Sequence, residues 1–357
     1  MNRPTALSPL AQAFTQGPVW FPQQMDAATD RVLLVRMPED AYCTASFLDQ
    51  RMLTQQSQPQ WADWTELEAA DQATRHDAHW IFHIGHVGST LIARLLGELD
   101  GVFALREPQI LRNFADLAAD RAEAHAIWSP ERYDARLETA IGWLSRTFAP
   151  DDRALIKASS FVSEIAESLI GTDREALMLS VSPQRYLETI LAGDNSRQEL
   201  AMLAPQRLRR LHARLGSADW RLWQLSEAVR AAMSWLSEML ALDAAASAAP
   251  DTHVQWLDFD DFLADPSSRL SEIARFFGID ADAEAVSSLV EGPIMTQYSK
   301  APEHGYSRDV RDSLLAEARA AHADGIAEAL TWLNDAADRY GAVATIMDRY
   351  AARNMGT

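Results

Sequence analysis

The sequence predicts an α/β fold in which helices cover both faces of a central parallel sheet. Short, almost wholly apolar runs alternate with longer stretches whose apolar residues recur at helical spacing. Strands that are buried on both faces read as continuous apolar runs, which is typical of parallel sheets. The chain has 357 residues, of which 48 % are apolar and 23 % are charged. It is therefore long enough to build one large domain, or two modest ones, around a sizeable core.

Five apolar runs are the predicted strands, in the order HWIFHI (79–84), VFALR (102–106), RALIK (153–157), ALMLSV (176–181) and HVQWLDF (253–259). A stretch of helical periodicity follows each strand. After the first strand, for example, the leucines and isoleucine of STLIARLLGEL recur every three to four residues. SSFVSEIAESLI (159–170) is a predicted helix, and long helices fill about 197–248 until an alanine-rich break, AAASAAPDT, ends them.

The alternation begins only near residue 76, which suggests a division of the chain. We expect residues 1–75 to form a small N-terminal appendage with a strand at 31–37 and a polar linker at 55–60. The main domain is expected at 76–300. A helical C-terminal extension, packed on the core, is expected at 301–357.

The charge balance narrows the range of partners. The 51 acidic and 32 basic residues give a formal charge of −19, which disfavours nucleic acids and anionic membranes. Cys43 is the only cysteine, so neither an intramolecular disulfide nor a multi-cysteine metal site is possible, and we expect a cytoplasmic protein. No run of 18 apolar residues predicts a membrane span, and the N-terminus lacks the apolar run of a signal peptide. The sequence leaves the oligomeric state open.

In parallel sheets covered by helices, ligands bind beyond the carboxyl ends of the strands. Polar and small residues follow the predicted strands at these positions. They are Gly85 to Thr90, Arg106 and Glu107, Lys157, Ser180 to Pro183, and Asp258. The sequence therefore predicts a polar site along one edge of the sheet.

The segment HIGHVGST (83–90) lies between the first strand and its helix. Gly85 and Gly88 allow a tight turn, and Ser89 and Thr90 open the helix, so unpaired backbone amides and hydroxyls could bind a phosphate or sulfate. An ordinary strand-to-helix turn, with a serine N-cap, would use the same residues. The nucleotide-binding pattern GxxxxGK[ST] is not met, because His83 occupies its first glycine position and Ser89 its lysine position.

Four histidines, His76, His79, His83 and His86, lie around this turn. On a continuous helix their spacing would form a metal-binding face, but the strand and glycine pattern scatters them. No metal site is therefore predicted.

The segment GHVGSTLIARLL resembles the 5′-phosphosulfate loop of the P-loop sulfotransferases, with Gly88 to Leu91 on the family's GTTL. Further segments are similar in the same order over about residues 79–300. LREPQIL matches the family's glutamate segment, IKASSFV its lysine segment and LSVSPQRYLET its 3′-phosphate segment, while WLDFDDFLADP resembles a later structural segment. The resemblance implies a P-loop NTPase-like three-layer sandwich. It also implies the cofactor PAPS (3′-phosphoadenosine 5′-phosphosulfate).

The resemblance implies a role for each matched residue. Glu107 would be the base and Lys157 the cation at the transferring group, while Gly85, His86, Val87, Gly88, Ser89 and Thr90 would bind the 5′-phosphosulfate. His86 replaces a family arginine or lysine, and Val181 replaces a family arginine. Ser182 and Thr189 would then be neutral donors to the 3′-phosphate. Arg185 or Arg197 would supply the charge from a shifted position.

The implied activity is transfer of a sulfuryl group from PAPS to a hydroxyl or amine of a small-molecule, peptide or lipid-headgroup acceptor, without a metal. Two alternatives remain open at this point. A nucleotide-dependent kinase-like protein would use the same loop. A sulfotransferase-like protein without catalysis would serve as a binding or scaffold module, as the loss of cations at His86 and Val181 suggests.

Overall fold

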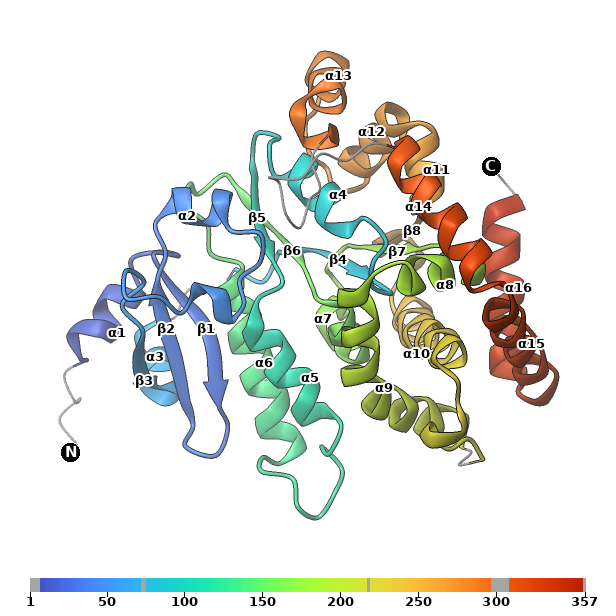
Figure 1. Cartoon of the computed structure of the whole chain (residues 1–357). Helices are drawn as coiled ribbons and strands as arrows, with labels where there is room; N and C mark the ends of the chain where they lie inside the picture. The colour runs from blue at the N-terminus through green and yellow to red at the C-terminus, as the bar shows by residue number, and fades with distance from the viewer. Residues whose placement is uncertain (1–6, 72–74, 217–218, 297–307, 356–357) are drawn as a thin grey trace.

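The computed structural model describes residues 7–71, 75–216, 219–296 and 308–355, which form two sheets and the helices around them (Figure 1). Within these residues, no helix is both long and apolar enough to cross a membrane. The C-terminal helices, α14 Arg308–Ala321, α15 Ala323–Arg339 and α16 Gly341–Met355, lie on the same side of the molecule as α8 Pro183–Leu191 and α10 Glu227–Ala248 (Figure 1).

The central sheet consists of the five predicted strands, all parallel, in the order β5-β6-β4-β7-β8. Their bounds are β4 His79–His83, β5 Val102–Arg106, β6 Arg153–Lys157, β7 Ala176–Ser180 and β8 Val254–Asp258. Every residue of β4 and β7 is buried, as expected for strands covered on both faces. The predicted strands and their parallel pairing are confirmed.

Helices cover both faces of this sheet, so the predicted three-layer α/β class is confirmed. In Figure 1, α4 and α12 lie above the sheet, and α7 and α10 lie below it. The helices of this part are α4 Ser89–Leu96, α5 Gln109–Ala118, α6 Pro130–Leu144, α7 Ala166–Ile170, α8 Pro183–Leu191, α9 Asp194–Leu215, α10 Glu227–Ala248, α11 Phe259–Ala264, α12 Pro266–Phe276, α13 Ala283–Glu291, α14 Arg308–Ala321, α15 Ala323–Arg339 and α16 Gly341–Met355.

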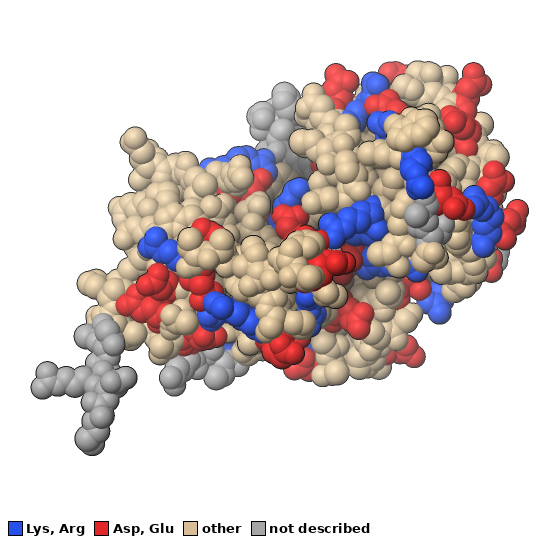
Figure 2. Space-filling view, turned by 90° about the horizontal axis from the view of Figure 1, so that it is seen from below, with Lys and Arg blue, Asp and Glu red and all other residues tan. Residues whose placement is uncertain are grey.

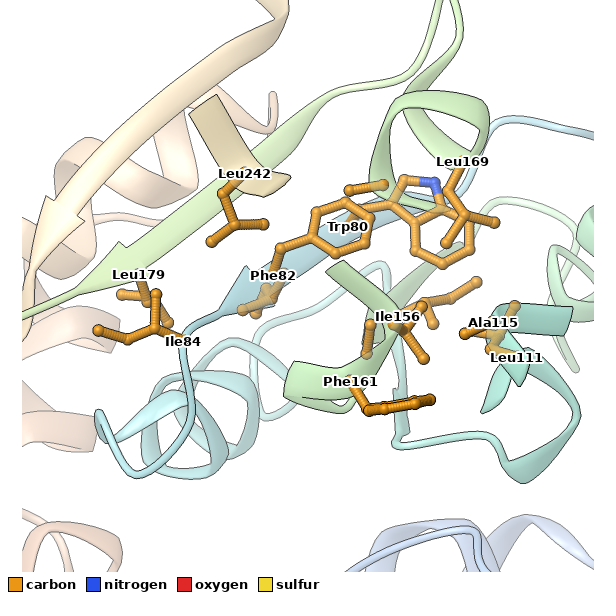
Figure 3. Close-up of a cluster of buried hydrophobic side chains, with 14 of the residues drawn as sticks. Trp80, Phe82, Ile84, Leu111, Ala115, Ile156, Phe161, Leu169, Leu179 and Leu242 are labelled. Carbon is orange, nitrogen blue, oxygen red and sulfur yellow. The ribbon is translucent and has the colours of Figure 1, made fainter. Parts of the chain in front are cut away.

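The core beneath the central strand is built from large apolar side chains. Trp80 and Phe82 alternate on β4 and therefore share one face of the sheet, where their rings stack with centroids 5.7 Å apart. Ile156, Phe161 and Leu169 surround them (Figure 3). This packing fixes β4 rigidly, and the loop that follows β4 therefore starts from a fixed point.

Two helical predictions need correction. The predicted end of the long helices near residue 248 is confirmed, because α10 ends at Ala248. The predicted alanine-rich break at 244–252 starts too early, however, since residues 244–248 are helical and the helix ends only where Pro250 follows. Alanine has the highest helix propensity, so only the proline ends this helix. The predicted helix at 159–170 begins as a 3-10 helix, η2 Ser160–Ile165, and becomes α-helical only from Ala166.

The N-terminal region forms a three-stranded antiparallel sheet, of which only the middle strand was predicted. Its elements are α1 Pro9–Phe14, β1 Trp20–Asp26, β2 Arg31–Arg36, α2 Glu39–Thr44, the 3-10 helix η1 Gln50–Met52, β3 Gln60–Asp63 and α3 Trp64–Ala70. The outer strands mix polar and apolar residues, so their sequences gave no alternating pattern to recognise.

Buried arginines join this N-terminal region to the main sheet. Arg106, at the end of β5, donates to the backbone carbonyls of Tyr42, Cys43 and Ala45, at 2.7, 3.0 and 2.5 Å. Arg146, from the segment after α6, donates to the carbonyl of Phe14 at 2.5 Å, and burial lowers its pKa to about 10. The Arg106 contacts hold the C-terminal end of α2 against the carboxyl end of β5, and Arg146 holds the end of α1.

The connections of the strands define where a ligand would bind. From the central strand β4 the chain passes through α4 to the edge strand β5 and returns through β6, beside β4. It then crosses to β7 on the other side of β4. The direction of winding changes at β4, and such a switch point leaves a crevice beyond the carboxyl ends of the strands.

Candidate functional site

A cavity of about 610 Å³ lies beyond the carboxyl ends of the strands, at the switch point. We call it the strand-end cavity. Residues 85–90 line it after β4, Glu107 after β5 and Lys157 at the end of β6. Cavities of this size are typical of small-molecule and cofactor sites.

The loop between β4 and α4 has an unusual backbone. Gly85, His86 and Gly88 all have positive φ, at +95°, +55° and +69°, and Ser89 is the first residue of α4. This geometry turns the chain sharply into the N-terminus of the helix, where backbone amides lack helical partners and the helix dipole is positive. The loop can therefore bind an anion through its backbone.

Gly88 is also fixed by packing. A Cβ atom at this position would lie 2.0 Å from two ring carbons of Phe259, which follows β8. The phenyl ring closes one side of the loop, so Gly88 is required both by its backbone angle and by its neighbour.

His83 holds the start of the loop. Its Nδ1 accepts a hydrogen bond from the amide of Gly85 at 3.0 Å, and its Nε2 lies 2.9 Å from the carbonyl oxygen of Ala158. These two contacts fit the neutral imidazole with its proton on Nε2. His83 thus ties the loop after β4 to the segment after β6.

His86 lies within the loop between β4 and α4, and its ring contacts a carboxylate. Its Nε2 lies 3.2 Å from Oε2 of Glu199, on α9. Both residues line the strand-end cavity. Glu199 therefore orients the His86 imidazole from the opposite wall of the cavity.

Glu107 and Lys157 form an ion pair in the cavity. The Lys157 ammonium, whose side chain is 1 % exposed, donates to Oε1 of Glu107, which is 24 % exposed. The Lys157 ammonium also lies 5.3 Å from the ring centroid of Phe47. A buried cation beside a partly accessible carboxylate is an arrangement that can move a proton and stabilise a negative charge.

The backbone of Glu107 is strained, with a φ of +56° in a residue that is not glycine. Its amide donates to the carbonyl of Lys157 at 2.7 Å. On both sides the chain is held by Leu48, whose amide donates to Arg106 and whose carbonyl accepts from Gln109. Strain of this kind persists where surrounding contacts enforce it, most often at functional sites. The N-terminal region thus helps to position Glu107.

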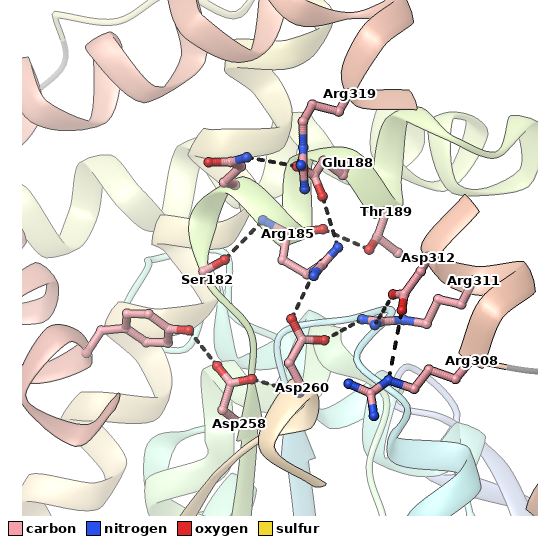
Figure 4. Close-up of polar contacts among 12 residues, drawn as sticks. Ser182, Arg185, Glu188, Thr189, Asp258, Asp260, Arg308, Arg311, Asp312 and Arg319 are labelled. Atoms are coloured by element: carbon pink, nitrogen blue, oxygen red, sulfur yellow. Dashed lines mark hydrogen bonds and ion pairs between the residues drawn. The ribbon is translucent and has the colours of Figure 1, made fainter. Parts of the chain in front are cut away.

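The predicted 3′-phosphate residues are only partly brought together. Thr189 lines the strand-end cavity, and its hydroxyl donates to the carbonyl of Arg185 at 2.8 Å. Ser182 instead caps α8 by accepting from the amide of Arg185, at 3.1 Å (Figure 4). Among the described residues that line the cavity, neither Ser182, Arg185 nor Arg197 is present.

The two arginines expected to supply charge are held by carboxylates. Nε of Arg185 donates to Asp260 at 2.8 Å, and its Nη1 contacts Glu188 at 3.2 Å (Figure 4). Burial lowers the pKa of Arg185, but the hydrogen bond and charge of Asp260, together with the charges of Glu188 and Asp312, raise it more, so the pKa lies above its usual value. Arg197 pairs with Glu227 at 2.8 Å. The structure therefore does not bring either guanidinium into the cavity.

Three other arginines line the cavity, and the sequence had not singled them out. Arg51 comes from the N-terminal region, Arg112 from α5 and Arg311 from α14. Arg112 lies on the helix directly after Glu107, so the helical pattern of 109–118 was the one available signal. Arg51 and Arg311 lie in segments without a motif. Only the folded chain brings them to the strand ends.

The cavity lining differs in charge from the rest of the chain. Its described residues include four cations against three carboxylates, and therefore one excess positive charge, in a chain of formal charge −19: Arg51, Arg112, Lys157 and Arg311 against Asp49, Glu107 and Glu199. Elsewhere charges of both signs are interspersed, as Figure 2 shows for one face. The site thus suits an anionic ligand although the whole protein is acidic.

A buried ion pair supports the wall of the cavity. Nε of Arg207 lies 2.7 Å from Oε1 of Glu238, with side chains 3 % and 2 % exposed. Nη2 of Arg207 donates to the hydroxyl of Ser160 at 3.2 Å, and the Ser163 hydroxyl donates to Glu238. The hydroxyl of Ser160 faces Gly85, since it would lie 3.4 Å from a Cβ atom there. The pair therefore links α9 and α10 to the loop.

The strand order, and a glycine-bracketed loop between the central strand and its helix, define a three-layer α/β protein of the P-loop NTPase-like type. No protein-family model matches the sequence, and no curated protein matches it.

Among solved structures, the chain is similar to the sulfotransferase domain of the curacin biosynthetic pathway, at 13 % identity and a TM-score of 0.41, over 70 % of this chain and 99 % of that one. It is also similar to a sulfotransferase from Alicyclobacillus acidocaldarius, at 13 % identity and a TM-score of 0.35, over 72 % and 96 %. A third is retinol dehydratase in complex with androsterone and the inactive cofactor PAP, at 12 % and 0.32, over 91 % and 97 %. With identities this low, the function has to be argued from the site.

Proposed function

We propose that this protein is a PAPS-dependent sulfotransferase that acts on a hydroxyl or amine of a small-molecule, peptide or lipid-headgroup acceptor. The observation that carries the proposal is that residues 85–90, Glu107 and Lys157 line one cavity at the carboxyl ends of the strands. The same residues match the sulfotransferase motifs in the same order along the sequence.

The loop residues fit a phosphosulfate group. The positive φ angles of Gly85 and Gly88 and the start of α4 at Ser89 favour an anion bound by backbone amides of residues 87–90. The hydroxyls of Ser89 and Thr90 would add donors. The excess positive charge of the lining would replace the missing loop cation. Thr189 and Arg311 are the described candidates for the nucleotide end.

PAPS, when bound, supplies the sulfuryl group. Glu107 would accept the proton from the acceptor hydroxyl as the new S–O bond forms, and the bond to the departing PAP breaks in line. Lys157 would stabilise the negative charge that develops on the leaving phosphate oxygen. The ion pair between Lys157 and Glu107 holds both groups in place before the acceptor enters.

Ligand-induced stabilisation tests the nucleotide. Thermal unfolding is measured with PAP (3′-phosphoadenosine 5′-phosphate), ADP and GDP, each with and without Mg²⁺. A ligand at 100 times its Kd adds about 2.7 kcal/mol to the stability of the native state. We expect PAP to raise the Tm without metal. A Tm raised only by ADP with Mg²⁺ would favour the kinase-like alternative, and no shift with PAP would favour a scaffold; either result would overturn the proposal.

The base is tested by replacing Glu107 with glutamine. We expect Glu107→Gln to lower the rate of transfer from ³⁵S-labelled PAPS to the best acceptor of a phenol and amine panel about 100- to 10,000-fold, because the amide accepts no proton. PAP should raise the Tm of the variant as it does for the wild type. Glu167→Gln, on the exposed surface of α7, is the matched control. An unchanged rate in Glu107→Gln would exclude this residue as the base.

A further inference from the structure

The positions of the proposed site residues across the sheet separate an acceptor end from a nucleotide end. This inference rests on the proposed function. The loop at 85–90 follows the central strand β4, while Thr189 and Phe259 lie on the β7 and β8 side. Glu107 follows the edge strand β5 on the other side. The acceptor end of the strand-end cavity is therefore the end at β5.

Arg112 lies at this acceptor end. It is on α5, the helix directly after Glu107, and its guanidinium lies 5.0 Å from the ring centroid of Phe161. Four residues lie between it and Glu107 in the sequence, so the two backbones are on the order of 10 Å apart. Both side chains line the strand-end cavity.

Arg112 differs from the other two cavity arginines in its partners. Arg51 donates two hydrogen bonds to Asp49, and Arg311 donates to Asp260. Burial raises the pKa of Asp116, one turn further along α5, and the nearby charge of Arg112 lowers it in part. Within the described residues, however, no hydrogen bond or ion pair joins the Arg112 guanidinium to a carboxylate. Its donors are therefore available to a ligand.

The chemistry of a guanidinium defines the ligand. Five N–H donors in a planar fork match a carboxylate, phosphate or sulfate better than a neutral group. The guanidinium of Arg210 lies 3.7 Å from the centroid of the same Phe161 ring, and it donates a hydrogen bond to the carbonyl of Phe161. Arg210 is paired with Glu164 at 3.7 Å, so the Arg112 guanidinium is the one at this ring that can bind an acid.

We propose that the acceptor carries an anionic group that binds Arg112 while its hydroxyl lies at Glu107. The acceptor class is then a hydroxyl-bearing acid small enough for its acidic group and its hydroxyl to lie together in the strand-end cavity of about 610 Å³.

Matched acids and amides test this class. The probes are 4-hydroxybenzoate with 4-hydroxybenzamide, and 4-hydroxyphenylacetate with 4-hydroxyphenylacetamide, titrated calorimetrically into the PAP complex. We expect the wild type to bind an acid about 10- to 100-fold more tightly than its amide, as for hydrogen bonds to charged groups. Arg112→Gln should remove this preference by weakening the acid alone, and Arg112→Lys should keep part of it. Arg275→Gln, an exposed arginine on α12, controls for the loss of one charge.

The outcomes separate the two proposals. If PAP fails to bind the wild type, the proposed function itself fails. If PAP binds but no acid binds better than its amide, or if Arg112→Gln weakens acid and amide equally, the acceptor inference is overturned. A loss of PAP affinity in Arg112→Gln would assign Arg112 to the nucleotide and would also overturn it.

Discussion

Gly88→Ala is expected to destabilise the protein by about 2–5 kcal/mol and to abolish stabilisation by PAP. The left-handed backbone angle of +69° alone costs an L-residue about 1–2 kcal/mol. The new methyl group would also lie 2.0 Å from ring carbons of Phe259, and such overpacking costs about 1–3 kcal/mol more. Urea unfolding measures the loss of stability, and a thermal shift with PAP measures the loss of stabilisation by the ligand.

Two further variants separate strain from overlap. Gly101→Ala places alanine at a φ of +80° with nothing within 4 Å of its Cβ, so it should cost only the backbone term, about 1–2 kcal/mol. In a Phe259→Ala background, Gly88→Ala should also destabilise the protein by only about 1–2 kcal/mol, because the ring that overlaps the new methyl group is absent. Additive effects of Gly88→Ala and Phe259→Ala would show that the ring does not close the loop.

Arg207→Met is expected to destabilise the protein by about 3–5 kcal/mol, because it leaves the buried carboxylate of Glu238 without its cation. The pKa of Arg207 supports this dependence. Burial lowers the pKa of Arg207, but the charge and hydrogen bond of Glu238, together with the charges of Tyr186 and Glu199, raise it more, so the pKa lies above its usual value. The measurement is again urea unfolding at neutral pH.

Replacing the whole polar cluster should reverse most of this loss. The triple variant Arg207→Met, Glu238→Leu and Ser163→Ala removes both buried charges and the Ser163 hydroxyl together, and only the Ser160 hydroxyl loses its donor. Apolar replacements of buried ion pairs are often neutral or stabilising. The triple variant should therefore be markedly more stable than Arg207→Met alone. Equal instability of the two would mean that the loss comes from packing and not from the orphaned charge.

The main sheet could be predicted from the sequence because each strand is buried on both faces. Every residue of β4 and β7 is buried, so these strands read as continuous apolar runs. The strands β1 and β3 of the N-terminal sheet could not be predicted in this way. Each has an exposed or partly exposed side and, in β1, a proline, so the local pattern does not separate them from loops.

The candidate site was predictable only where it follows from the strand ends. Glu107, Lys157 and residues 85–90 come directly after strands or at their ends, so the sheet itself brings them into the same cavity. Arg185 and Arg197 were inferred from proximity in sequence to the 3′-phosphate segment. In the fold they are held by Asp260 and Glu227, because those carboxylates come from segments that the sequence does not place beside them.

The sequence by itself determined the five parallel strands, the glycine loop after the first of them and the carboxylate and lysine at the neighbouring strand ends. Only the tertiary structure decided which cations line the cavity. Arg51 arrives there because Leu48 pairs with the backbone beside Glu107, and Arg311 arrives on a C-terminal helix. The physical reason is that the periodicity and burial of a helix or strand repeat between neighbouring residues, so they can be recognised along the sequence. The partners of a charged side chain come instead from segments that meet only after the sheet has formed.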